Sequence, residues 1–166
     1  MMKDGNVERQ QAVQGVETVV QSQADLESDL KFSPENIVEA YTTHSAKFAY
    51  WAIVAAQAKS AMDKKKLELE RQDDFIKKTL VGELDGIVRQ QMDEDGIKIT
   101  EAKVAGRIYT HPRYLDEQSK LYSLQNELAE LQHQYGLLSA AKEAMVHRKD
   151  MLVSLGAQLR QEMTVC

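Results

Sequence analysis

One long stretch without glycine or proline, residues 35–81, most restricts how this chain folds. Ser33 and Pro34 come directly before it and supply a side-chain acceptor and a fixed φ, as at a helix start. A seven-residue repeat keeps apolar side chains on one side of a helix and is typical of helices packed along their length. The stretch has such a repeat at Tyr41, Phe48, Ala55, Met62, Leu69 and Ile76. We therefore predict one helix over residues 34–80.

A second repeat of the same period follows His111 and Pro112. It consists of Leu124, Leu131, Leu138, Met145, Leu152 and Leu159 and predicts a helix over residues 113–163. Two long helices with matching repeats most simply fold back on each other as an antiparallel helical hairpin, a coiled coil. With 8 Gly and 2 Pro, the chain has too few turn residues for a sandwich, a barrel or a doubly wound sheet. The expected fold class is mainly all-α.

The segment between the two helices, residues 81–112, changes character. Gly82 and Gly86 disfavour a helix, and the segments Ile87-Val88-Arg89 and Ile97-Lys98-Ile99 flank the turn signal Asp95-Gly96. This pattern predicts a short β-hairpin or an extended connector. Thr100 then has the side chain expected before a short helix from residue 101.

The first 32 residues differ from the rest. They are rich in glutamine and carry 3 basic and 6 acidic residues, and their apolar residues are small and scattered. We interpret residues 1–32 as a flexible or weakly helical N-terminal arm, and residues 33–166 as one helical-hairpin domain.

Several large apolar residues lie outside the two repeats, and a two-helix hairpin has too little core to bury them. They are Tyr50, Trp51, Ile53 and Val54 on the first helix and Leu137, Met151, Val153 and Leu155 on the second. We expect these surfaces to pack on copies of the same chain, which predicts a homo-oligomer.

Composition limits the compartment and the chemistry. The net charge of −5 excludes a wholly basic nucleic-acid-binding domain, although a local basic patch remains compatible with it. The longest apolar run has eight residues, 49–56, whereas a membrane helix needs about 20. No signal-peptide pattern opens the chain, and the single cysteine, Cys166, excludes an intrachain disulfide. We expect a cytoplasmic protein that does not cross a membrane.

Catalytic motifs are missing from the sequence. It has no Gly-rich phosphate loop, Cys-x-x-Cys, Gly-x-Ser-x-Gly or paired-histidine motif. We therefore expect a protein that is not an enzyme and that needs no metal or cofactor.

A basic cluster marks the middle of the first helix: Lys59, Lys64, Lys65, Lys66 and Arg71. One interpretation is a solvated face whose cations pair with nearby Asp and Glu side chains. The other is a stripe that binds the phosphates of nucleic acid. A second basic patch, Lys142, Arg148 and Lys149, lies on the second helix. In an antiparallel hairpin it lies alongside the start of the first helix, near Lys47, Phe48, Tyr50 and Trp51. Cations beside aromatic rings are typical of single-strand binding, although aromatics in a heptad repeat are usually core.

Three segments resemble the UvsY-type recombination mediators of tailed phages. They are AQAKSAMDKK at residues 56–65, ITEAKV at 99–104 and LSAAKEAMVHRKDML at 138–152, the last being the most specific. The resemblance covers about residues 40–160. It implies a helical protein that forms rings, binds single-stranded DNA, loosens the single-strand-binding protein and loads a RecA-like recombinase in a phage-infected bacterial cell. In that family basic residues of the first helix contact DNA, which corresponds here to Lys59 and Lys65, with Lys64 and Lys66 beside them; Asp63 departs from the pattern.

Two other classes fit the same helices. Two long helices joined by a β-connector also describe a prefoldin-like chaperone, and a phage structural or assembly scaffold needs only the hairpin. The acidic connector disfavours the chaperone, because client holding requires apolar residues at the helix tips.

Overall fold

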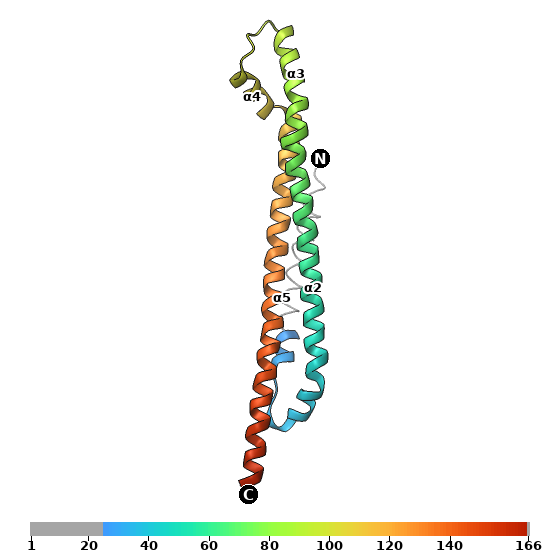
Figure 1. Cartoon of the computed structure of the whole chain (residues 1–166), viewed down its shortest axis with the longest axis vertical. Helices are drawn as coiled ribbons and strands as arrows, with labels where there is room; N and C mark the ends of the chain where they lie inside the picture. The colour runs from blue at the N-terminus through green and yellow to red at the C-terminus, as the bar shows by residue number, and fades with distance from the viewer. Residues whose placement is uncertain (1–24, 166) are drawn as a thin grey trace, which may run out of the picture. The chain divides into compact units, whose positions relative to one another are not determined.

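The structure, a computed structural model, describes residues 25–165, of which 92% are helical, with no strand among them. The all-α class is thereby confirmed. Residues 25–30 form a short helix, and the other elements are η1 (a 3-10 turn, Pro34–Asn36), α2 (Ile37–Phe75), η2 (a π-helical turn, Ile76–Leu80), α3 (Val81–Glu94), α4 (Glu101–Tyr109) and α5 (Pro112–Val165) (Figure 1). Most of the arm expected over residues 1–32, namely 1–24, and Cys166 lie outside the described residues.

The chain divides into two compact units. The described part of unit 1 is residues 25–55 and 137–165, and unit 2 is Ala56–Gly136. Both α2 and α5 contribute a segment to each unit, and within each unit the two segments run antiparallel. Side-chain contacts join residue 41 to 152 and 44 to 148 in unit 1, and residue 65 to 127 and 72 to 117 in unit 2.

The first long helix begins where Ser33 and Pro34 predict it. The backbone N–H of Ser33 donates a hydrogen bond to Oδ1 of Asn36 at 2.7 Å, which satisfies a donor at the helix start. The start thus combines a fixed φ at Pro34 with a local side-chain cap.

The two heptad repeats face inward. Ala55 and Ile76 of the first repeat are 5% and 4% exposed, and Met145 and Leu152 of the second are 0% and 1% exposed. Burial of these side chains removes apolar surface from water at about 25 cal/mol per Å2, which favours the helix pairing in each unit. Tyr41 is the exception, at 42% exposed, although its hydroxyl donates to the carbonyl of Leu152 at 2.5 Å.

The core of unit 2 follows a different spacing. From η2 onward the buried residues recur every four positions: Ile76, Leu80, Leu84, Val88 and Met92. Val104 and Ile108 of α4 pack against this stripe, because α4 folds back along α3 (Figure 1). Leu121 of α5 completes the cluster. The π-helical turn lies where the seven-residue repeat changes to the four-residue stripe.

The β-hairpin expected in residues 81–99 is wrong, since residues 81–94 form α3. Gly82 and Gly86 lie on the exposed side of that helix, so their missing side chains cost the core nothing, and the four-residue stripe outweighs their low helix propensity. Gly96, with a φ of 65°, ends the helix instead of turning a hairpin. The N–H of Ile97 donates to the carbonyl of Met92 at 2.8 Å, which is the Schellman pattern. Only residues 97–100 are extended connector.

Trp51 also differs from expectation. It is 2% exposed and packs with Ala141 and Met145 in the core of its own unit, so it is not available to a second copy. Other residues outside the repeats remain at the surface: Tyr50 (55%), Ile53 (57%), Leu137 (44%), Met151 (60%) and Val153 (49%).

Candidate nucleic-acid interface

Four of the five cations in the first basic cluster are exposed on α2 in unit 2: Lys59, Lys64, Lys66 and Arg71. Among residues 25–165 their side chains form no ion pair or hydrogen bond. Residues seven apart on a helix lie on nearly the same face. Lys59 and Lys66 therefore form one row and Lys64 and Arg71 a second, and the four span about 18 Å of the helix axis.

Lys65 is placed differently. Its Nζ forms ion pairs with Glu68 of α2 and Glu127 of α5, both at 2.8 Å, and its side chain is 22% exposed. Hydrogen bonds to Glu127 and to Glu68 raise the pKa of Lys65. Lys65 therefore joins the two helices of unit 2, and its charge is already neutralised by two carboxylates.

The two lysines of η2 are neutralised as well. Lys77 pairs with Asp73 at 2.6 Å and Lys78 with Asp74 at 2.7 Å, each one helical turn apart. Asp73 and Asp74 also lie close in sequence to the basic cluster, but they pair with Lys77 and Lys78. Lys65 therefore has acidic partners, as the solvated-face interpretation expects, whereas the four exposed cations have none among residues 25–165.

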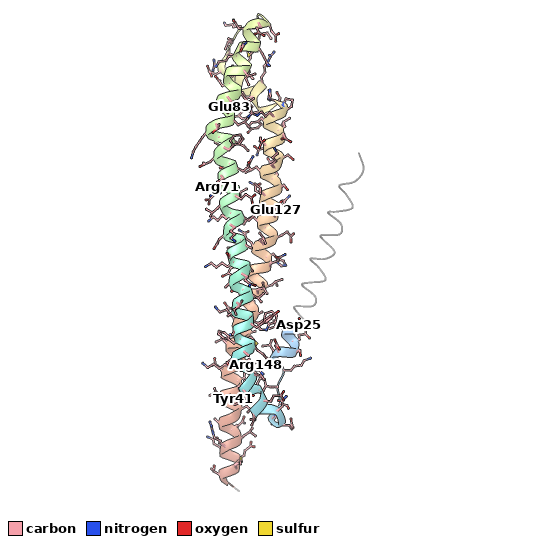
Figure 2. The ribbon with its side chains drawn as sticks, turned by 90° about the vertical axis from the view of Figure 1, so that its right-hand side faces the viewer. Asp25, Tyr41, Arg71, Glu83, Glu127 and Arg148 are labelled. Atoms are coloured by element: carbon pink, nitrogen blue, oxygen red, sulfur yellow. The ribbon has the colours of Figure 1, made fainter. Side chains whose placement is uncertain are left out.

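Arg71 borders a groove between α2 and α5 of unit 2. Figure 2 labels it on α2, with Glu127 on the neighbouring helix. The groove is lined by Glu68, Arg71, Gln72, Lys120, Ser123, Leu124 and Glu127. Its charges are mixed, because Lys120 already pairs with Asp116 and Glu117 at 2.9 and 2.8 Å. Of the two cations that line the groove, only Arg71 is therefore available to bind an anion.

The three residues of the second basic patch do not form one exposed surface. Lys142 and Lys149 are exposed on α5, but Arg148 is 2% exposed and lies inside unit 1. Its guanidinium donates to the carbonyl of Ala40 at 3.3 Å and to Nδ1 of His44 at 3.1 Å, and it lies 5.4 Å from the ring centre of Phe32. Arg148 is therefore not part of an exposed basic patch, because α2 and Phe32 cover it.

The contact between His44 and Arg148 fixes the state of the imidazole. A guanidinium has only donors, so Nδ1 of His44 must accept and the ring is neutral. Burial, and then the charges of Arg148 and Lys149, lower the pKa of His44. Burial also lowers the pKa of Arg148, opposed by the charge of Asp29.

Asp29 is the residue that sequence reasoning missed. Its Oδ1 pairs with Nζ of Lys47 at 3.0 Å, and its Oδ2 accepts a hydrogen bond from the indole N–H of Trp51 at 3.0 Å. Leu26 and Leu30 of the same short helix pack on the cluster around Trp51. Their spacing of four, with Asp29 between them, is a helical pattern that marks this segment as a packed element.

Comparison of the chain with protein-family models, with curated proteins and with solved structures finds no match. No helix within residues 25–165 is both long enough and apolar enough to cross a bilayer.

Proposed function

We propose that this protein is a non-enzymatic recombination mediator of the UvsY type. It binds single-stranded DNA as a homo-oligomeric ring in the cytoplasm of a phage-infected cell. It helps to load a RecA-like recombinase onto DNA that is covered by single-strand-binding protein. The resemblance of residues 56–65, 99–104 and 138–152 to that family supports the class.

The observation that carries the proposal is the set of four exposed cations on α2 with no acidic partner in the described chain: Lys59, Lys64, Lys66 and Arg71. Phosphate contacts by lysine and arginine supply most of the affinity of proteins that bind nucleic acid without sequence preference. Four such charges on a protomer of net charge −5 give weak binding that depends on salt.

Repetition of the site in an oligomer supplies the remaining affinity. When several protomers hold one strand, each further contact is intramolecular and its effective concentration is high. The exposed apolar residues of unit 1 favour such an assembly. Tyr50, Ile53, Leu137, Met151 and Val153 are 44–60% exposed, and we propose that copies of the chain cover them and form the coiled-coil ring.

The test is binding of a fluorescently labelled oligo-dT at two salt concentrations, with the mass of the oligomer measured in the same buffer. The test variant replaces Lys59, Lys64, Lys66 and Arg71 by Ala. The matched control is Lys77→Ala/Lys78→Ala, which removes lysines of the same helical run that are already paired with aspartates.

We expect the wild type and the control to bind as oligomers and to release DNA as salt rises. The fourfold variant keeps its helical spectrum and its mass and loses binding. If the wild type is a folded oligomer that binds no DNA at low salt, the cations are only a solvated face and an assembly scaffold becomes the better proposal. The β-connector that suggested a prefoldin-like chaperone is absent from residues 25–165, so that alternative loses its support.

A further inference from the structure

A short acidic segment packs within unit 1 beside Lys47, Trp51 and Arg148. We name residues 25–32 the acidic strap; they contain Asp25, Glu27 and Asp29 and one basic residue, Lys31. The two carboxylate oxygens of Asp29 bind two different donors. One oxygen forms an ion pair with the ammonium group of Lys47, and the other accepts a hydrogen bond from the indole N–H of Trp51, both at 3.0 Å. A phosphodiester also offers two anionic oxygens on one centre, so the same donors suit it.

The apolar side chains of the strap cover an indole ring and a cation. Leu26 and Leu30 pack on the cluster of Trp51, Ala141 and Met145, on which Phe48 also packs, and Phe32 of the strap lies over the guanidinium of Arg148. Exposed rings beside cations are the combination with which proteins bind single strands, since the rings stack on bases while the cations hold phosphates. The strap thus covers both halves of such a site at once.

The charge of Arg148 is incompletely compensated where it lies. Within residues 25–165 its Nε has no hydrogen-bond partner and its guanidinium has no ion pair, although the side chain is 2% exposed. Its described partners are a carbonyl, a neutral imidazole and a ring, and Asp29 acts on it only through its charge. A buried cation of this kind favours an anion nearby. Asp29 is that anion when the strap is in place.

We propose that the acidic strap is a displaceable mimic of nucleic acid. It occupies a phosphate-binding site formed by Lys47, Trp51 and Arg148 of unit 1, and single-stranded DNA competes with Asp29 for that site. This inference rests on the proposed function. Unit 1 then holds a second DNA-binding site, which the strap covers in the free protein. DNA binds at this site only when the strap is released.

The contacts of the strap suit an exchangeable element. The ion pair between Asp29 and Lys47 is partly solvated, with side chains 24% and 31% exposed, so its net contribution is small and falls as salt rises. The leucines that hold the strap are only partly buried. A polyanion that brings many phosphates at high local concentration can therefore replace one carboxylate.

Trp51 makes the proposal directly measurable, because it is the only tryptophan in the chain. Its emission is recorded while unlabelled oligo-dT is added to the full-length protein, and binding is followed in parallel with labelled oligo-dT. We expect the emission to be quenched with the same midpoint as binding, because a base replaces the packing of Leu26 and Leu30 on the indole.

Variants separate competition from simple packing. Asp29→Asn removes the charge that competes with phosphate and is expected to tighten oligo-dT binding about fivefold, the equivalent of one surface ion pair. Glu27→Gln is the matched control, since it makes the same charge change on the exposed side of the strap and leaves the affinity within about twofold of wild type. Adding Lys47→Ala to Asp29→Asn removes the gain, because the phosphate then loses its cation.

Each outcome is decisive. Labelled DNA that binds without any change in Trp51 emission, with Asp29→Asn no tighter than Glu27→Gln, overturns the competing strap and leaves the proposed function intact. An absence of binding in every variant overturns both. If Asp29→Asn unfolds, the titration of wild-type Trp51 emission decides alone.

Discussion

Two adjacent lysines of the basic cluster should behave in opposite ways when each is replaced by alanine. Lys64 is exposed with no acidic partner in the described chain, whereas Lys65 is held between Glu127 and Glu68. For single strands, each phosphate contact contributes about 0.7 to the slope of the logarithm of the binding constant against the logarithm of salt concentration. Lys64→Ala should therefore lower the slope per bound protomer by about 0.7, and Lys65→Ala should leave it unchanged.

The magnitude is accessible to an ordinary titration. Over a fourfold rise in salt, a slope difference of about 0.7 corresponds to about 2.6-fold in affinity, so that the wild type loses that much more than Lys64→Ala. Stability should change in the reverse sense. Lys65→Ala removes two partly solvated ion pairs and should lower the free energy of unfolding by less than about 1 kcal/mol, while Lys64→Ala should not change it.

The assay is fluorescence anisotropy of labelled oligo-dT at four or more salt concentrations, together with urea denaturation followed by circular dichroism. The reasoning is refuted if Lys65→Ala lowers the slope as much as Lys64→Ala does. That result would mean that phosphates replace the two glutamates as partners of Lys65. The ion pairs would then not determine which cations bind DNA.

Three further predictions concern packing and pH. A Cβ added at Gly136 would meet open space, so Gly136→Ala should stabilise the protein by up to about 1 kcal/mol, because alanine favours a helix. A Cβ added at Gly156 would lie 2.9 Å from the Tyr41 hydroxyl, so Gly156→Ala should destabilise the protein by about that amount. Thermal denaturation measures both changes. Leu84→Ala should lower the free energy of unfolding by about 2–5 kcal/mol in urea, because Leu84 is fully buried in unit 2. The lowered pKa of His44 means that the unfolded chain binds more protons just below about pH 6.5. Stability should therefore fall from that pH toward the lowered pKa, and His44→Gln should reduce this fall; an unchanged pH profile would contradict it.

The helices and their inward faces could be predicted from sequence because their signals are local. A seven-residue repeat identified Ala55 and Met145 as core positions, and both are buried. The end of the first helix could not be placed, because Gly82 and Gly86 lower helix propensity locally while the stripe of Leu84 and its neighbours is stabilised by α4 and α5. Tertiary packing overrode propensity there.

The site was predicted only in part, for a related reason. A list of cations along α2 does not distinguish Lys64 from Lys65, because the acid that neutralises Lys65 is Glu127, far away in sequence. The same holds in unit 1, where Arg148 meets groups more than a hundred positions earlier. Charge patterns reveal which residues are basic, but only the fold reveals which of them already have a partner.

The separation in sequence between contacting residues differs greatly between the units, and this has a consequence for the order of folding. Arg89 of α3 pairs with Glu101, 12 positions away, whereas Arg148 and His44 are 104 positions apart. Loop closure costs about 2 kcal/mol more in entropy for the longer loop. The hairpin of α3 and α4 should therefore form first, and pairing of Lys65 with Glu127 then shortens the loop that remains. On the ribosome, residues 25–55 must wait for residues 137–165 to be synthesised before their core can form. During that interval Trp51 and its neighbours are exposed to solvent. If translation ended before residue 137, they would remain exposed.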